Sequence, residues 1–201
     1  MASNNIDKGL DFMNGYAMLK RSRDDSLNAT TSGSKTPQYV IQCPGTDIFT
    51  SDLGKISGKD ASSDTAPCLW IETGAARLAT YDSSGQLSGD GKVVSCDPIV
   101  LMKYGDWAPS IQQLMIEGKK IDQIIIKRVV SIRQTLEVIQ EIDYSTCLIK
   151  TYKQEGGTIM FSFNYVEVTD LSRVFGHEGD LLGQRGMKFN SSNLKIESIS
   201  S

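Results

Sequence analysis

Residues 158–169 read TIMFSFNYVEVT, and this stretch decides the fold class. Its large apolar residues fall at every second position: Ile159, Phe161, Phe163 and Tyr165. A period of two is the period of a β-strand, because successive side chains of a strand point to opposite faces of the sheet. We therefore predict a strand over residues 158–169 whose aromatic face is buried in a core.

The segments before this strand have the same β-rich character. Three of them are predicted strands, because they are rich in β-branched residues: 121–130, 136–142 and 146–153. Residues 154–157 read QEGG, which is typical of a tight hairpin turn. The second half of the chain is therefore predicted to be an antiparallel meander.

Three more strands are predicted upstream, over residues 39–43, 68–80 and 93–103. Gly74 interrupts the second of them and predicts a bulge or a sharp bend. Pro98 cannot donate a ladder hydrogen bond, so the third strand must place it at an edge or a bulge.

One helix is predicted in this body, over residues 108–117. Pro109 suits the start of a helix, and Gly118 suits its C-terminal cap. A weaker final strand is predicted over residues 186–197, and residues 170–185 are predicted to be a glycine-rich connection. These elements predict a mainly β fold: a closed or nearly closed antiparallel β-barrel or sandwich of about eight strands with one short flanking helix.

The first part of the chain differs from the rest, and we predict two regions. Residues 1–36 form an N-terminal arm with a short helix and a polar linker, and residues 37–201 form the β-barrel domain. The whole chain has 201 residues, of which 39% are hydrophobic and 22% are charged, as in a soluble globular protein. No stretch has the length and apolar character of a membrane span, and the N-terminus lacks the pattern of a signal peptide.

Composition also excludes several kinds of site. The net charge is −3, so the chain has no global basic field for nucleic acid. The single histidine, His177, excludes metal sites built on two or three histidines. The four cysteines form no C-x-x-C pair, so we expect reduced thiols that are mostly packed as small apolar residues. No catalytic residue, metal ligand or cofactor is predicted, and we expect the protein not to be an enzyme.

Several motifs together resemble the Hcp family, the tail-tube proteins of type VI secretion systems and relatives of phage tail-tube proteins. The motifs are PIVLMKYGD at 98–106, APS at 108–110, GKKI at 118–121 and FSFNYVEV at 161–168. YVIQCPG at 39–45, WIE at 70–72 and GMKF at 186–189 resemble the first, second and terminal strands of the family. The chain departs from the family pattern at Trp107 and Ala108, in its N-terminal arm and in the long connection 170–185. It is therefore identified as a divergent member.

The resemblance implies a structural role in self-assembly. Family members form six-membered rings that stack, and a long loop after the first strand reaches towards the next ring. In this chain that loop spans residues 46–67, and Ile48, Phe49 and Leu53 are the candidates for the contact between rings. The alternative is that these three side chains pack back on their own barrel.

Three other residues are candidates for contacts between subunits: Trp107, Glu137 and Glu141. The two glutamates would share one strand face, because four residues separate them. Ser162 and Asn164 lie opposite the aromatic face of the predicted strand and would face either a lumen or solvent.

The resemblance thus implies a ring-forming inner-tube subunit, a hexamer as in the family, that is expelled with effectors by a type VI-like contractile apparatus. The alternative is a monomeric adaptor or chaperone of a bacterial secretion machine that uses the same fold. Expected partners are further copies of the chain, the sheath and spike proteins of the apparatus and secreted effectors, with no nucleic acid and no membrane insertion. The expected location is the bacterial cytoplasm, with export through the apparatus.

Overall fold

The computed structural model describes residues 39–49, 55–56, 59–60, 64–77, 80–81, 87–88, 93–132, 135–176, 180–191 and 195–200. The predicted N-terminal arm, Leu53 and His177 lie outside these ranges. The division of the chain at residue 36 therefore stays a prediction.

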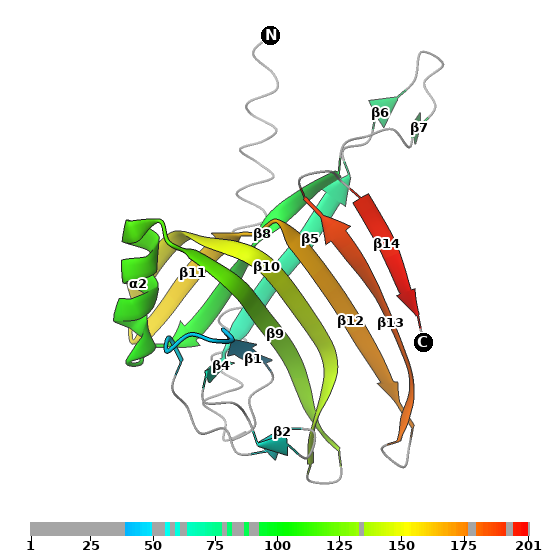
Figure 1. The fold of residues 1–201 in the computed structure, drawn as a ribbon, viewed down its shortest axis with the longest axis horizontal. Helices are drawn as coiled ribbons and strands as arrows, with labels where there is room; N and C mark the ends of the chain where they lie inside the picture. The colour runs from blue at the N-terminus through cyan, green and yellow to red at the C-terminus, as the bar shows by residue number, and fades with distance from the viewer. Residues whose placement is uncertain are drawn as a thin grey trace. The chain divides into compact units, whose positions relative to one another are not determined.

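The described residues fold as an antiparallel β structure with one flanking helix (Figure 1). The main sheet contains ten strands: β1 (Tyr39–Gln42), β4 (Thr65–Cys68), β5 (Trp70–Arg77), β8 (Val93–Lys103), β9 (Lys120–Ile132), β10 (Thr135–Glu155), β11 (Thr158–Asn164), β12 (Glu167–Phe175), β13 (Leu181–Asn190) and β14 (Lys195–Ser200). Two small hairpins pair β2 (Lys55–Ile56) with β3 (Lys59–Asp60) and β6 (Thr80–Tyr81) with β7 (Leu87–Ser88). The mainly β, antiparallel fold class predicted from sequence is confirmed.

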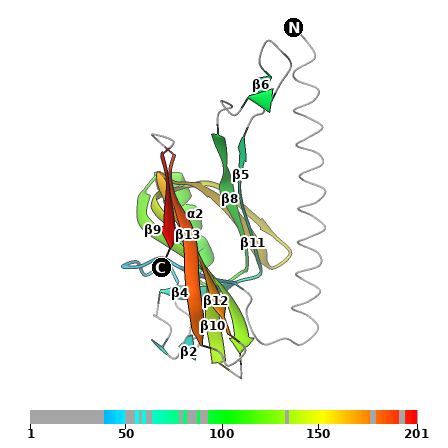
Figure 2. The same ribbon diagram turned by 90° about the vertical axis from the view of Figure 1, so that its right-hand side faces the viewer.

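The sheet is open rather than closed. Its strand order is β14-β13-β12-β10-β11-β8-β5, and β9 joins β10 to β1, which in turn pairs with β4. Within the described part of the chain, β14 pairs only with β13, and β5 pairs only with β8. Figure 2 shows the β12–β13–β14 part and the β5–β8–β11 part as two layers seen from the side. Each layer thus ends in a strand with one free edge.

The long strand β10 connects the two layers. Its first half pairs with β12 over residues 140–145, and its second half pairs with β11 over residues 148–155. Thr146 has a φ of 54° at the point where the partner changes. The sequence predicted two strands, over 136–142 and 146–153, and this was wrong, because the residues between them continue the ladder with β9.

The predicted strand 158–169 is in fact two strands. β11 ends at Asn164 and β12 begins at Glu167, so both lie end to end along one edge of β10. The break is held by hydrogen bonds: the Val166 N–H donates to the Ser145 carbonyl at 3.1 Å, and the Ser191 hydroxyl donates to the Tyr165 carbonyl at 2.9 Å. The alternation alone does not show this change of partner.

The prediction that residues 170–185 form a connection is also wrong, because most of these residues lie in the hairpin of β12 and β13. The predicted last strand, 186–197, is divided between β13 and β14. Both faces of this region carry exposed side chains. It therefore lacks the apolar alternation that identifies a half-buried strand.

The ladder between β5 and β8 is irregular beside Gly74, where a bulge or bend was predicted. The register shifts between Glu72 and Gly74, and the extra residue belongs to β8, because Thr73 alone lies opposite Asp97 and Pro98. Pro98 lies at the same irregularity, between the paired residues Cys96 and Ile99 of β8. The proline therefore occupies a position where the ladder needs no N–H.

The helix α2 (Trp107–Glu117) confirms the predicted flanking helix. It ends at Gly118, whose φ of 61° is in the left-handed region. The Gly118 N–H donates to the Met115 carbonyl at 3.3 Å, and the Lys119 N–H donates to the Leu114 carbonyl at 3.2 Å. These bonds satisfy carbonyls that the last helical turn leaves without a partner.

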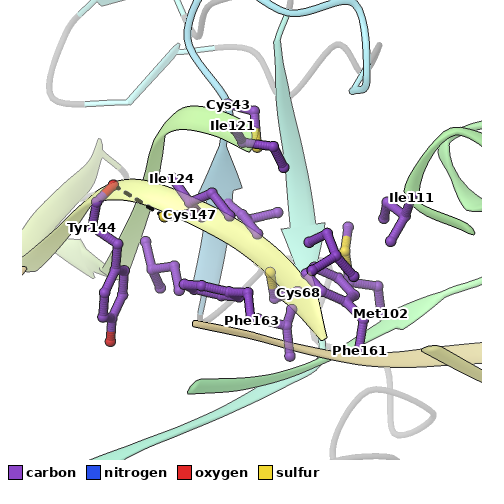
Figure 3. Packing of buried hydrophobic residues seen from close by; sticks show 14 of the residues in the cluster. Cys43, Cys68, Met102, Ile111, Ile121, Ile124, Tyr144, Cys147, Phe161 and Phe163 are labelled. Atoms are coloured by element: carbon purple, nitrogen blue, oxygen red, sulfur yellow. Dashed lines mark hydrogen bonds between the residues drawn. The ribbon is translucent and has the colours of Figure 1, made fainter. Parts of the chain in front are cut away.

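The core lies between the layers and α2 (Figure 3). Ile159, Phe161 and Phe163 are at most 1% exposed, so the predicted aromatic face is confirmed. The Phe163 ring meets the Tyr144 ring edge-to-face, with 5.1 Å between centroids. A smaller cluster of Val40, Val129 and Val138 packs with Ile56.

The cysteines behave as expected from the sequence. All four are free thiols; Cys43, Cys68 and Cys147 are buried in the core, and Cys96 is exposed. Burial is the largest cause that raises the pKa of each buried thiol, to about 12 for Cys147. The buried thiols therefore stay protonated at neutral pH and act as small apolar side chains.

Candidate functional site

The candidates for the contact between rings lie in different environments. Phe49 is 1% exposed and meets Trp107 edge-to-face, with 6.3 Å between ring centroids. Ile48 is half-buried against the same core. Phe49 therefore packs on its own domain, which is the alternative considered for it from the sequence. A role of Ile48 and Leu53 between rings stays a prediction, and Leu53 lies outside the described residues.

Trp107 lies at the first turn of α2 and packs the helix against the core. Its Nε1–H donates to the Lys103 carbonyl at 3.2 Å, and its ring packs beside Phe49. A Cβ on Gly105 would come within 2.6 Å of the ring, so only glycine leaves room for the indole. These contacts give Trp107 a structural role within the domain, and its predicted role between subunits stays a prediction.

The expectation that Glu137 and Glu141 share one strand face is wrong. Glu137 is opposite Val130 and Glu141 is opposite Lys127, with a register shift between Val138 and Gln140. This bulge adds one residue to β10, and a shift of one residue exchanges the two faces of a strand. The two glutamates therefore lie on opposite faces of the sheet.

Glu141 belongs to a charged surface on β10, β12 and β13 that the sequence did not reveal. The Arg173 Nη2 is 3.4 Å from the Glu141 Oε2, and the Lys188 Nζ is 2.8 Å from the Glu167 Oε1. Asp143 lies among these groups. Residues on three strands come together here, so only the strand register identifies the surface.

Asp143 is the member of this surface whose carboxylate is only partly hydrogen-bonded. Its Oδ2 accepts a hydrogen bond from the Gln123 Nε2 at 2.7 Å, whereas its Oδ1 is buried without a hydrogen-bond partner. Burial is the largest cause that raises the pKa of Asp143, and the Gln123 hydrogen bond opposes it. The neighbouring carboxylates of Glu141 and Glu167 also raise this pKa.

Ser162 and Asn164, which were expected to face a lumen or solvent, make side-chain hydrogen bonds within the domain. Ser162 is 7% exposed, and its hydroxyl is 2.7 Å from that of Thr151. Asn164 is exposed, and with its amide nitrogen turned towards Asp97 it donates to Oδ1 at 2.8 Å. Lys150 forms an ion pair with the same carboxylate at 2.5 Å. A polar surface thus crosses β8, β10 and β11.

An apolar cleft lies between the two free edges of the sheet, and the sequence did not predict it. Its volume is about 210 Å³. The lining includes Gly74 of β5, Cys96 of β8, Tyr144 of β10, Met187 of β13 and Ile196 of β14. A second cleft of about 450 Å³ separates the loop after β1 from α2 and is lined mainly by polar residues. Both clefts are built from segments far apart in the sequence.

The described residues contain no group of three or more histidine, cysteine, aspartate or glutamate side chains placed to hold a metal ion. Among the same residues, no helix combines the length and apolar character needed to cross a membrane.

No protein-family model matches the chain, and no curated protein matches it. Solved structures do. A structure described as a type six secretion system protein has a TM-score of 0.67 and 14% identity, and the match covers 81% of this chain and 100% of that one. Hcp1 from Salmonella typhimurium has a TM-score of 0.59 and 13% identity, with 79% and 97% covered. A type VI secretion system effector from Yersinia pestis has a TM-score of 0.54 and 13% identity, with 76% and 98% covered.

These likenesses confirm, at the level of the fold, the resemblance found in the sequence. They extend over nearly the whole length of each solved chain, so the shared part is the complete domain rather than a single hairpin. The described domain of this protein has the fold of the Hcp proteins of type VI secretion systems.

Proposed function

We propose that the protein is a structural component of a type VI-like contractile secretion system: a ring-forming subunit of the inner tube. Six copies close a ring, rings stack into a tube, and the tube is expelled together with effectors. In this proposal the partners are further copies of the chain, the sheath and spike proteins and the effectors. The protein acts in the bacterial cytoplasm until it is exported.

The observation that carries the proposal is the likeness to a type six secretion system protein over the entire length of that chain. A family role requires the complete domain, and the complete domain is present. The likeness to a structure described as a type VI secretion system effector supports export of the protein itself.

The open sheet supports assembly with further copies. The outer edges of β5 and β14 have no strand partner within the described residues. A free edge presents unpaired N–H and C=O groups and is a template for pairing with another chain. Contacts between copies would use such edges, whereas a monomeric adaptor would leave them in solvent.

The test is the size and shape of the purified protein. Light scattering should give about 130 kDa for six subunits of 22.0 kDa, and negative-stain images should show rings. A monomer that persists at high concentration, without rings, would contradict the proposal and favour the monomeric adaptor. Ile116→Ser on α2 is a suitable control, because this side chain is 73% exposed and its loss should leave the size unchanged.

A further inference from the structure

One end of the β12–β13 hairpin carries an unusual group of exposed aliphatic side chains. Val174, Leu181 and Leu182, here called the aliphatic tip, are 58%, 54% and 64% exposed. The register shift between Val174 and Phe175 leaves Leu182 opposite no residue, so it is the bulged position of β13. Val174 pairs with Gly183 and Leu181 pairs with Phe175, so Val174 and Leu181 lie on opposite faces of the hairpin, and both faces of its end carry exposed aliphatic side chains. Exposed aliphatic side chains gathered at one end of an element are characteristic of an interaction surface.

The aliphatic tip projects beyond its neighbours in the sheet. β10 pairs with β12 only as far as Ser172, and β14 pairs with β13 only as far as Arg185. The residues between these positions form a two-stranded ribbon with no third strand beside it in the described chain. A ribbon of this kind contributes little burial to its own domain, so the aliphatic tip is available to another molecule.

The apolar cleft is the complementary feature. Two of its lining residues, Met187 and Ile196, are 46% and 55% exposed. A cavity of about 150 Å³ holds one benzene molecule. The volume of about 210 Å³ therefore accommodates one or two aliphatic side chains.

The aliphatic tip lies at the hairpin end of β12 and β13, and the apolar cleft lies along the other half of these strands. Met187 and Phe189, which line the cleft, are five and seven residues from Leu182 along β13, or roughly 17 and 23 Å at the rise of a strand. In Figure 1 the hairpin end of β12 and β13 is at the bottom, and β14 begins near the top. A molecule therefore cannot fill its own cleft with its own tip.

We propose that the aliphatic tip of one copy docks into the apolar cleft of the next copy. The inference rests on the proposed self-assembly of the chain and names the contact that adds copies along the strand direction. A projection at one end and a matching cleft at the other end make a heterologous, head-to-tail contact, which continues from copy to copy. Both surfaces are apolar and of compatible size, so contact between two copies removes both surfaces from water at once.

The exposed thiol of Cys96 lies in the cleft and permits a direct test, because the other three thiols are buried. In a Leu182→Cys variant, mild oxidation with copper phenanthroline should link the introduced thiol to Cys96 of another copy. Each copy would then be linked at both ends, so a non-reducing gel should show a ladder beyond the dimer. Mass spectrometry should identify the peptide pair that contains positions 182 and 96.

Two controls make the result specific. Adding Cys96→Ser to Leu182→Cys should remove the ladder and leave at most dimers linked through position 182. Ile116→Cys, at an even more exposed aliphatic position on α2, should give no ladder with Cys96. Absence of the ladder, or links found only between two copies of position 182, would overturn the docking proposal.

The outcomes also separate this inference from the proposed function. If rings of six subunits form but position 182 never links to Cys96, the docking contact is wrong and the ring-forming role stands. If the ladder forms while no rings are seen, the docking contact stands and the ring-forming role is wrong. A Leu181→Ser, Leu182→Ser double variant should lose stacks in negative stain while its circular dichroism spectrum is unchanged.

Discussion

Replacing Phe49 with alanine distinguishes the two roles considered for the loop after β1. If Phe49 acted between rings, Phe49→Ala would weaken stacking and leave the stability of the isolated domain unchanged. In the structure its ring is 1% exposed and packs edge-to-face on Trp107. We therefore expect a loss of folding stability.

The magnitude follows from the burial. Replacing a buried phenylalanine with alanine costs about 3–5 kcal/mol, of which an aromatic pair contributes about 0.5–1.5 kcal/mol. Phe49 lies in a loop rather than in a strand, and the site relaxes more easily, so the lower end of about 3 kcal/mol applies. With an m-value of roughly 2 kcal/mol per M, the midpoint in urea should fall by about 1.5 M.

The assay is equilibrium urea unfolding, followed by tryptophan fluorescence and by circular dichroism. Ile116→Ala is the matched control, and its 73% exposure predicts a change within about 0.5 kcal/mol. A double-mutant cycle of Phe49→Ala with Trp107→Ala should give a coupling of about 0.5–1.5 kcal/mol. If Phe49→Ala costs less than about 1 kcal/mol and yet abolishes stacking, Phe49 acts between copies and the reasoning is wrong.

Three further expectations follow from single residues. Gly186→Ala should destabilise the β12–β13 hairpin by about 1–3 kcal/mol, because its Cβ would clash with the Asp170 carbonyl; an unchanged midpoint in urea would contradict this. Burial raises the pKa of Asp143, so the charged carboxylate opposes folding at pH values above its ordinary pKa of 3.8. Asp143→Asn should therefore raise the melting temperature at pH 7 and change it little near pH 3. Equal shifts at both pH values would refute this. In the native protein, Cys96 alone should react rapidly with a thiol reagent, as counted by intact mass, and rapid labelling at two or more sites would show that the core is open.

Much of the fold was predictable because the deciding signals are local. Strand β8 has the predicted limits, the helix ends at Gly118 as predicted, and Pro98 lies at a ladder irregularity. Each of these features depends on the backbone preference of one residue or on the periodicity of a short segment. Such properties are contained in the sequence of that segment alone.

The errors concern features that depend on distant segments. The break after Asn164 coincides with the point where β10 passes from pairing with β11 to pairing with β12, and no glycine or proline within residues 158–169 marks it in the sequence. The bulge in β10 separates Glu137 from Glu141, and only its pairing with β9 reveals it. The apolar cleft was not predictable for the same reason, because its lining comes from six strands: β5, β8, β10, β12, β13 and β14.

The 21-residue strand β10 has a consequence for how the chain folds. It pairs with β11 in one layer and with β12 in the other, so neither layer is complete without β10. Its pairing with β11 is a local hairpin, whereas the pairing of β1 with β9 brings together residues distant in sequence, and structures dominated by such distant contacts fold slowly. During synthesis, therefore, the apolar faces of the early strands are uncovered until the last hairpins emerge from the ribosome. A cell that makes many copies of this chain has to keep nascent molecules apart during that interval.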